Sequence, residues 1–357
     1  MTGRPSAWLT AAIGGTLLLG AWMRWSLTGG LPFWGDFAHL RHGHSHLGYF
    51  GVLFPLAWMG WRAADAPVPG GRTLALYGVA TAVAFLGFLR AGYGVEAIAA
   101  STVVGGVWLV SAWRLRGRVL SPHDALAPVL PGVILAEACI PFIALYLDSD
   151  PSLASGWVAT FLALLLLCVL VPSALAAQEV RVPAAPLFGL AGALGAVALG
   201  FWPSLPTRLG LGLYAVWLLW LARQDPRFSL HLRTAWAAVG LGLGGVAVDV
   251  LPNVRPVAIG AIHFMILGPV LASLAPLVLR RAPVSDRAWW IGHGFAALLS
   301  VPLVLQGLGS GAWTLSASAL GGTGVVGWWG WALLRQGWIR PQAPPPPTEP
   351  HPQEGGP

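Results

Sequence analysis

The sequence predicts an all-α, polytopic bundle of about twelve membrane-spanning helices, and composition, apolar length and charge distribution all indicate it. The 357 residues are 56% hydrophobic and only 9% charged, with a mean hydropathy of +0.70. A soluble domain carries about a quarter charged residues, so this chain could not cover a water-facing surface. Long apolar stretches recur between Trp8 and Leu334, and crossing a bilayer takes roughly 20 apolar residues.

The expected spans follow one another along the chain, separated by turn and breaker residues such as those at 66–71 and 148–151. They cover residues 8–27, 45–62, 73–89, 95–113, 125–147, 156–176, 185–202, 207–222, 232–250, 257–279, 288–307 and 312–334. No cleavable signal peptide is expected, because the first apolar stretch is long and lacks a small-residue cleavage site. We therefore expect a transmembrane domain at 1–340 and a disordered, Pro-rich cytoplasmic tail at 341–357.

The basic residues indicate the orientation of the chain. All 20 are arginines, and threading the spans from the inside places 15 of them in cytoplasmic loops. The other five lie outside: Arg24, Arg41, Arg90, Arg208 and Arg255. The positive-inside rule then predicts that both termini are cytoplasmic. The net charge of +7 is explained by this asymmetry, so the expected partner is the lipid bilayer and not a nucleic acid.

Four histidines lie within eight residues at the outer start of the second span. Three of them follow an i, i+3, i+7 spacing and would share one helix face, while His44 would point elsewhere. Imidazole binds heme iron, copper and zinc, and is costly to leave unpaired in lipid. Hydrogen bonding to headgroups or loops is the alternative. The predicted metal ligands are His39, His42, His44, His46 and, from another span, His263.

His263 lies about six residues into the tenth span from the outer side, or ~9 Å at 1.5 Å per residue. His46 enters from the same side at a similar depth. Two imidazoles from different helices at matching depth could bind the two faces of one heme, although His263 alone is equally explained as a packing residue. His293 starts the eleventh span on the cytoplasmic side, and His231 is assigned to a cytoplasmic loop or helix end.

Isolated carboxylates and thiols give weaker signals. Glu96 and Glu137 fall within expected spans, where ionisable groups are functional-site hypotheses. Asp36 precedes the histidine run and could orient a ligating imidazole. The two cysteines, at 139 and 168, have no heme-attachment or zinc-ribbon spacing and are interpreted as buried hydrophobic residues.

Two short segments carry a family resemblance. Residues 41–51, with the sequence RHGHSHLGYFG, are similar to the second-helix segment that supplies a low-spin heme ligand in the heme–copper oxidase superfamily. His263-Phe264-Met265 is similar to the tenth-helix segment that carries the opposite ligands. The chain thus resembles oxidase and nitric oxide reductase catalytic subunits and their NnrS-like relatives. The resemblance implies heme b between one of His42, His44 and His46 and His263, with another transition metal such as copper as the alternative.

Departures from the family pattern limit what this resemblance implies. The family's copper site uses histidines on the sixth and seventh helices, and residues 156–202 contain none. The tenth span has one histidine where an active oxidase has two. A dinuclear oxygen-reducing centre is therefore not expected, and the heme–copper oxidase-like chain is predicted to lack the copper site.

Three functions remain open at the level of the sequence, and whether the protein is an enzyme is among the open points. The first is a heme protein of a bacterial-type inner membrane, for electron transfer with a redox partner or for a response to nitric oxide or another gas. The second is a multi-pass transporter with an outward-facing histidine-rich metal or proton site, although no clear six-helix repeat is evident. The third is a non-heme metal-dependent membrane enzyme that uses the His39–His46 cluster.

Overall fold

The computed structural model describes residues 7–32, 35–147, 149–200, 203–279 and 283–338, and the expected tail at 341–357 lies outside these ranges. The structure is 80% helix, without a strand in the described residues, and confirms the predicted polytopic helical bundle. Its helical segments form twelve rods, where a rod is one helix or a run of segments without an intervening loop. Seven of the described helices are long and apolar enough to cross a membrane.

Nine rods in the described chain are single helices. They are α1 (Ala7–Leu27), α4 (Gly71–Ala91), α5 (Val95–Trp113), α6 (Val129–Tyr146), α9 (Ala185–Gly200), α10 (Leu205–Gln224), α11 (Leu230–Ala247), α14 (Asp286–Gly307) and α15 (Trp313–Trp338). The short 3-10 turn η2 (Arg116–Arg118) lies in the loop between α5 and α6.

The second, sixth and tenth rods each contain a π-helical segment, in which the backbone bonds run from i to i+5. Their segments are α2 (Phe37–His46), η1 (Leu47–Leu53) and α3 (Phe54–Ala63); α7 (Pro151–Leu164), η3 (Leu165–Leu170) and α8 (Val171–Ala177); and α12 (Arg255–Met265), η4 (Ile266–Val270), α13 (Leu271–Leu274) and η5 (Ala275–Leu277). Pro55, Pro172 and Pro269 lie just after or within these π segments. Proline has no N–H, so each one leaves an upstream carbonyl without its helical donor.

Two of these rods begin earlier than the sequence predicts, because an aspartate caps them. Asp36 accepts hydrogen bonds from the amides of Ala38 and His39, which starts the second rod within the polar histidine run. Asp150 accepts from the amide of Leu153 and starts the sixth rod. Capping by a side-chain oxygen satisfies amides that have no helical partner, and hydropathy alone does not register it.

Tyrosine hydroxyls satisfy carbonyls of two π segments. Tyr77, on α4, donates to the carbonyl of Phe50 in η1 over 2.5 Å. Tyr214, on α10, donates to the carbonyl of Leu167 in η3 over 2.7 Å. A carbonyl left unpaired in the apolar interior would cost free energy, so these hydroxyls stabilise the interrupted rods.

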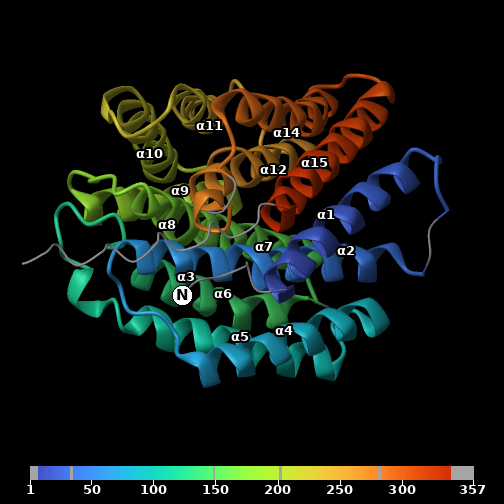
Figure 1. Ribbon diagram of the computed structural model, residues 1–357, viewed down its shortest axis with the longest axis horizontal. Helices are drawn as coiled ribbons and strands as arrows, with labels where there is room; N and C mark the ends of the chain where they lie inside the picture. The colour runs from blue at the N-terminus through green and yellow to red at the C-terminus, as the bar shows by residue number, and fades with distance from the viewer. Residues whose placement is uncertain (1–6, 33–34, 148, 201–202, 280–282, 339–357) are drawn as a thin grey trace, which may run out of the picture.

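The interrupted rods occupy corresponding places in three sets of four. Each is the second rod of its set, and their inner halves α3, α8 and α13 pack against one another. Successive rods pack side by side along the chain, and α1 packs against α15 to bring the first rod beside the last. In Figure 1, α10, α11 and α14 lie on one side of the bundle, and α4 and α5 on the opposite side. The interrupted rods therefore recur at every fourth rod along the described chain.

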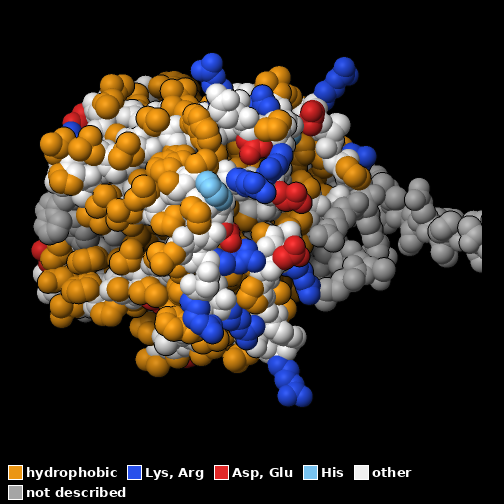
Figure 2. Space-filling view, turned by 90° about the vertical axis from the view of Figure 1, so that its left-hand side faces the viewer, with side chains coloured by type: hydrophobic (Ala, Val, Ile, Leu, Met, Phe, Trp, Pro, Cys, Tyr) orange, Lys and Arg blue, Asp and Glu red, His pale blue; other side chains and the backbone are white. Residues whose placement is uncertain are grey.

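The two ends of the bundle differ in charge. The α1–α2 connection lies at the right of Figure 1, and the α3–α4 connection at the left. Figure 2 turns the left-hand face toward the viewer and shows basic side chains gathered on it. Because the α3–α4 and α5–α6 loops belong to the predicted cytoplasmic set, this is the face that the positive-inside rule assigns to the cytoplasm.

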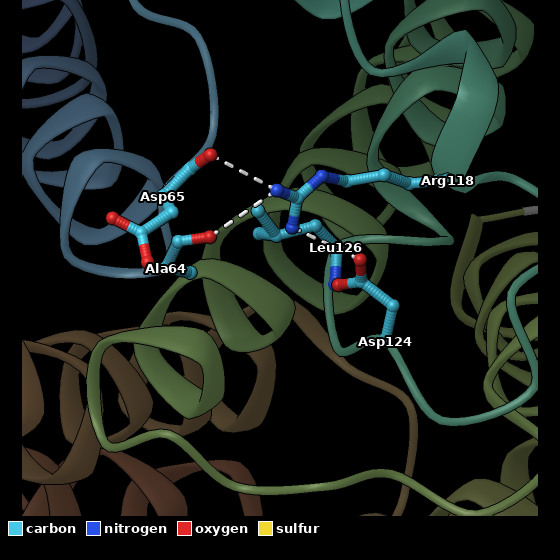
Figure 3. A network of polar contacts seen from close by, with 5 residues as sticks. All are labelled: Ala64, Asp65, Arg118, Asp124 and Leu126. Atoms are coloured by element: carbon cyan, nitrogen blue, oxygen red, sulfur yellow. Dashed lines mark hydrogen bonds and ion pairs between the residues drawn. The ribbon is translucent and has the colours of Figure 1, made fainter.

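On this face Arg118 forms hydrogen bonds that connect the end of α3 with the loop between α5 and α6 (Figure 3). Its Nη2 donates to the carbonyls of Ala64 (3.3 Å) and Asp65 (3.1 Å), at the end of α3. Its Nη1 lies 3.0 Å from Oδ2 of Asp124, whose Oδ1 accepts from the amide of Leu126 over 2.8 Å. The guanidinium thus joins the first set of four helices to the segment that leads into the second.

Candidate functional site

His44 on α2 and His263 on α12 face each other inside the bundle. Their ring centres are 6.4 Å apart and their planes are parallel to within 9°. His44 lies three residues before η1, which begins at Leu47, and His263 lies three residues before η4, which begins at Ile266. The two imidazoles therefore occupy corresponding positions on corresponding rods.

Both rings are held by backbone carbonyls. Nδ1 of His44 lies 3.0 Å from the carbonyl oxygen of Thr16, and Nδ1 of His263 lies 2.7 Å from that of Ile259. A carbonyl oxygen only accepts, so we assign the proton of each neutral ring to Nδ1. Each Nε2 then keeps its lone pair, which is the state of a histidine that ligates a metal through Nε2.

The spacing of the two rings matches that of imidazoles on opposite sides of one metal ion. A metal–nitrogen bond of about 2 Å on each side, plus about 1 Å from each nitrogen to its ring centre, gives about 6 Å between centres. The observed 6.4 Å agrees with this value. Both residues are half-buried.

Gly20 on α1 lies against the nitrogen-bearing edge of the His44 ring. A Cβ at this position would lie only 2.7 Å from Cε1 of the His44 ring. Atoms of real side chains do not approach so closely, and a larger residue would push the ring away. The close approach of α1 therefore positions the ring of His44.

Three arginines lie on the helices that form the site, and one of them, Arg24, acts on both of its histidines. Arg24 on α1 lies within electrostatic range of both His44 and His263, and Arg41 and Arg255 lie within range of each other on α2 and α12. The Arg24 guanidinium donates to the hydroxyl of Ser318 and the carbonyl of Gly20, at 3.2 Å each. None of the three arginines forms an ion pair with a carboxylate of the described residues. The site thus offers positive charge to an anionic group.

The other histidines of the run contact different partners. His46 stacks on Phe88 of α4, with ring centres 3.7 Å apart, and its Nδ1 bonds to the carbonyl of His42 over 2.9 Å. The His42 ring centre lies 4.6 Å from that of Tyr93. His39 packs on Gly92, where a Cβ would lie 2.9 Å from Cδ2 of the ring. The structure therefore brings His44, and not His46, to His263.

The four histidines of residues 39–46 do not form a metal site by themselves. Across the described ranges, no three side chains of histidine, cysteine, aspartate or glutamate are grouped so that they could hold a metal ion. A metal between His44 and His263 would therefore find no third ligand of these four types among the described residues.

The carboxylates that the sequence singles out have local roles in the structure. Asp36 bonds to backbone amides at the start of α2, and the amides of His39 and Ala38 lower the pKa of its carboxyl below the usual value. Glu96 pairs with Arg90. Glu137 lies against Gly105 of α5 and borders an apolar surface groove between α5 and α6.

A second pair of buried histidines lies near the cytoplasmic end, and sequence reasoning did not connect its members. Nδ1 of His231 on α11 lies 3.1 Å from Nε2 of His293 on α14. Both residues lie close to the cytoplasmic ends of their helices. The pair depends on the contact between α11 and α14, which are not successive along the chain, so no signal in the sequence joins the two residues.

No family model, curated protein or solved structure matches this chain. The chemistry of both histidine pairs therefore has to be argued from their geometry.

Proposed function

We propose that this membrane protein binds one heme b between His44 and His263, near its outer face, and serves in electron transfer in a bacterial-type inner membrane. The observation that carries the proposal is the pair of parallel rings 6.4 Å apart. Their Nδ1 atoms are engaged by backbone carbonyls, which leaves the lone pair of both Nε2 atoms available for ligation.

A porphyrin accounts for the ligands that the chain does not supply. Two imidazoles are too few to hold a bare copper or zinc ion, which takes three or four protein ligands in most sites. Heme brings four nitrogens of its own and needs only the two axial positions filled. Its propionate carboxylates would also find a cation in Arg24, which acts on both rings and has no carboxylate partner among the described residues.

Ligation by His44 and His263 would favour electron transfer over binding of a gas, because the two imidazoles would leave the iron no open coordination site. When bound, such a heme supplies reversible one-electron chemistry at iron. The chain holds the two rings through the carbonyls of Thr16 and Ile259 and through Gly20, so that the ligands move little between redox states. The outer position of the site suits a redox partner that approaches from the outer aqueous side.

The test is the absorption spectrum of the detergent-purified protein, oxidised and reduced, after expression with ample heme. We expect a sharp reduced band of low-spin heme in the wild type, lost in His44→Ala and His263→Ala. The matched controls are His46→Ala and His293→Ala, which remove buried imidazoles elsewhere and should keep the band. Equal heme content in all four variants, or a wild type without heme, would contradict the assignment.

A ligand exchange separates loss of the heme from loss of the fold. His44→Met offers a thioether in place of an imidazole, and histidine–methionine ligation raises the reduction potential of heme. We expect this variant to retain heme with a changed spectrum and a higher potential. An unchanged spectrum and potential would show that His44 is not a ligand.

A further inference from the structure

His231 on α11 and His293 on α14 form a buried contact between these two helices, near the predicted cytoplasmic end of the bundle. His231 is 4% exposed and His293 is 7% exposed. Nδ1 of His231 and Nε2 of His293 are 3.1 Å apart, within hydrogen-bond distance. The ring of His231 also lies parallel to that of Trp289, at 5.8 Å and 8°, which fixes its plane. Each ring therefore has one nitrogen in the pair and one facing away from it.

The free nitrogen of His231 faces the aqueous side. Its Nε2 lies 3.6 Å from Oδ1 of Asp286, whose side chain is 72% exposed. Asp286 begins α14, which follows a predicted cytoplasmic loop. A shift of a few tenths of an ångström, or one water molecule, would complete a hydrogen bond from this carboxyl to the ring.

The free nitrogen of His293 faces the interior. Nδ1 of His293 is buried and has no hydrogen-bond partner in the described structure. It points to the region of Gly268, where a Cβ would lie 3.8 Å from it. Gly268 is the residue at which the tenth rod leaves helical geometry, with φ −83° and ψ −105°, and Pro269 follows it. A buried polar nitrogen without a partner is costly, so its retention at a helix break calls for a functional explanation.

We propose that Asp286, His231 and His293 form a proton relay that gives the helix break at Gly268 access to protons from the cytoplasm. If the two histidines served only for packing, we would expect the inner nitrogen, Nδ1 of His293, to have a hydrogen-bond partner. The relay is independent of whether a heme is bound at the outer site.

The transfers balance when His293 ends as an imidazolium. In the receiving state both neutral rings carry their proton on Nδ1, so Nδ1–H of His231 donates to Nε2 of His293 and Nε2 of His231 faces Asp286. A cytoplasmic proton is taken up by the Asp286 carboxylate. The carboxyl gives this proton to Nε2 of His231, and His231 gives its Nδ1 proton to Nε2 of His293. Asp286 is then ionised, His231 is neutral with its proton on Nε2, and His293 carries the additional proton beside Gly268; the reverse transfers return the proton.

The groups that act electrostatically on the relay belong to it. Asp286 acts electrostatically on His231, and His231 acts electrostatically on His293. Protonation of His293 should therefore respond to the state of the other two members.

The experiment follows the protonation of His293 after a pH step in liposomes that hold the full chain in one orientation. Time-resolved infrared spectra of ring-labelled histidine give the signal, and the His293→Gln variant identifies the bands of His293. We expect the wild type to respond to a step on the cytoplasmic face. His231→Phe keeps a ring beside Trp289 but no nitrogen, and should slow the response about a hundredfold or more. Asp286→Asn should slow it as well.

The matched control is His123→Ala, which removes an exposed histidine of the α5–α6 loop and should leave the rate unchanged. A wild-type rate in His231→Phe, or a response only to a step on the outer face, would overturn the proposal. If His231→Phe does not fold, nitrogen NMR of the labelled wild type decides. The two rings should change tautomer over the same pH range, and independent changes would refute the relay.

Discussion

The imidazole of His44 lies parallel to that of His263 to within 9°, with 6.4 Å between ring centres, although one is on the second rod and the other on the tenth. Each ring is held through Nδ1 by a backbone carbonyl, of Thr16 and Ile259 respectively. The carbonyl of Thr16 belongs to α1, and that of Ile259 belongs to α12, the helix of His263 itself. The geometry of the pair is thus set by three helices, α1, α2 and α12.

The contribution of α1 to this geometry can be tested at one glycine. Gly20→Ala places a Cβ 2.7 Å from Cε1 of His44 and should displace the ring. We expect heme retention to weaken about tenfold, as for other residues that position metal ligands. Gly14→Ala on the same helix is the control, because a Cβ there meets nothing within 4 Å. Titration of heme into both purified variants measures the effect, and equal affinities would argue against a role for Gly20.

The cap at Asp36 should make the start of α2 sensitive to acid. Because the amides of His39 and Ala38 lower the folded-state pKa of Asp36, its cap is fully present above the unfolded-state pKa. It is lost as the pH falls through the lowered folded-state pKa. Asp36→Asn keeps a capping oxygen that does not titrate in this range. Hydrogen exchange of the Ala38 and His39 amides should rise on acidification in the wild type relative to Asp36→Asn, and identical profiles would contradict the prediction.

The tyrosines that donate to the π segments should each matter for stability. Tyr77→Phe and Tyr214→Phe leave the carbonyls of Phe50 and Leu167 without that donor. Each change should destabilise the protein by about 1–3 kcal/mol, the cost of a buried unsatisfied acceptor. Unfolding of the detergent-solubilised protein measures it. Tyr146→Phe, at the end of α6, is the control. If it lowers stability as much as Tyr77→Phe and Tyr214→Phe do, the hydrogen bonds to the π-segment carbonyls have no particular role.

The loop contacts of Arg118 should stabilise the cytoplasmic side. Arg118→Ala removes its bonds to Ala64, Asp65 and Asp124, and we expect a loss of about 1–2 kcal/mol, since these groups are only partly exposed. The neighbouring Arg116 is exposed, and Arg116→Ala should change stability little. The comparison uses the unfolding transitions of both variants. Equal transitions would mean that the loops are held without Arg118.

The sequence was sufficient to predict the twelve rods, because apolar length and arginine distribution follow directly from the cost of placing charges in lipid. It also placed His46 and His263 at similar outer depth. It did not predict which histidine of the run turns to His263, because that depends on the packing of α1 at Gly20 and of α4 at Phe88. The helix spacing separated His44 from the face shared by the other three histidines, but it did not predict which residue His44 would contact.

The π segments and the His231–His293 pair could not be derived in the same way. Pro55 and Pro172 occur in continuous apolar runs, and hydropathy does not distinguish an α turn from a π turn. The pairing of His231 with His293 depends on the contact between α11 and α14, which are not successive rods. Contacts between helices far apart in the chain are the part of the fold that single-sequence patterns do not determine.

The interruption at Gly268 also has an electrical consequence. It divides the tenth rod into half-helices, and the outer half, α12, directs its carboxyl end to the middle of the bundle. The peptide dipoles of a helix sum to a partial negative charge at that end. His293 lies beside it, so an imidazolium there would be attracted by the α12 macrodipole. A break in one backbone thus creates a region in the apolar interior where a positive charge is less costly than in the surrounding lipid-like core.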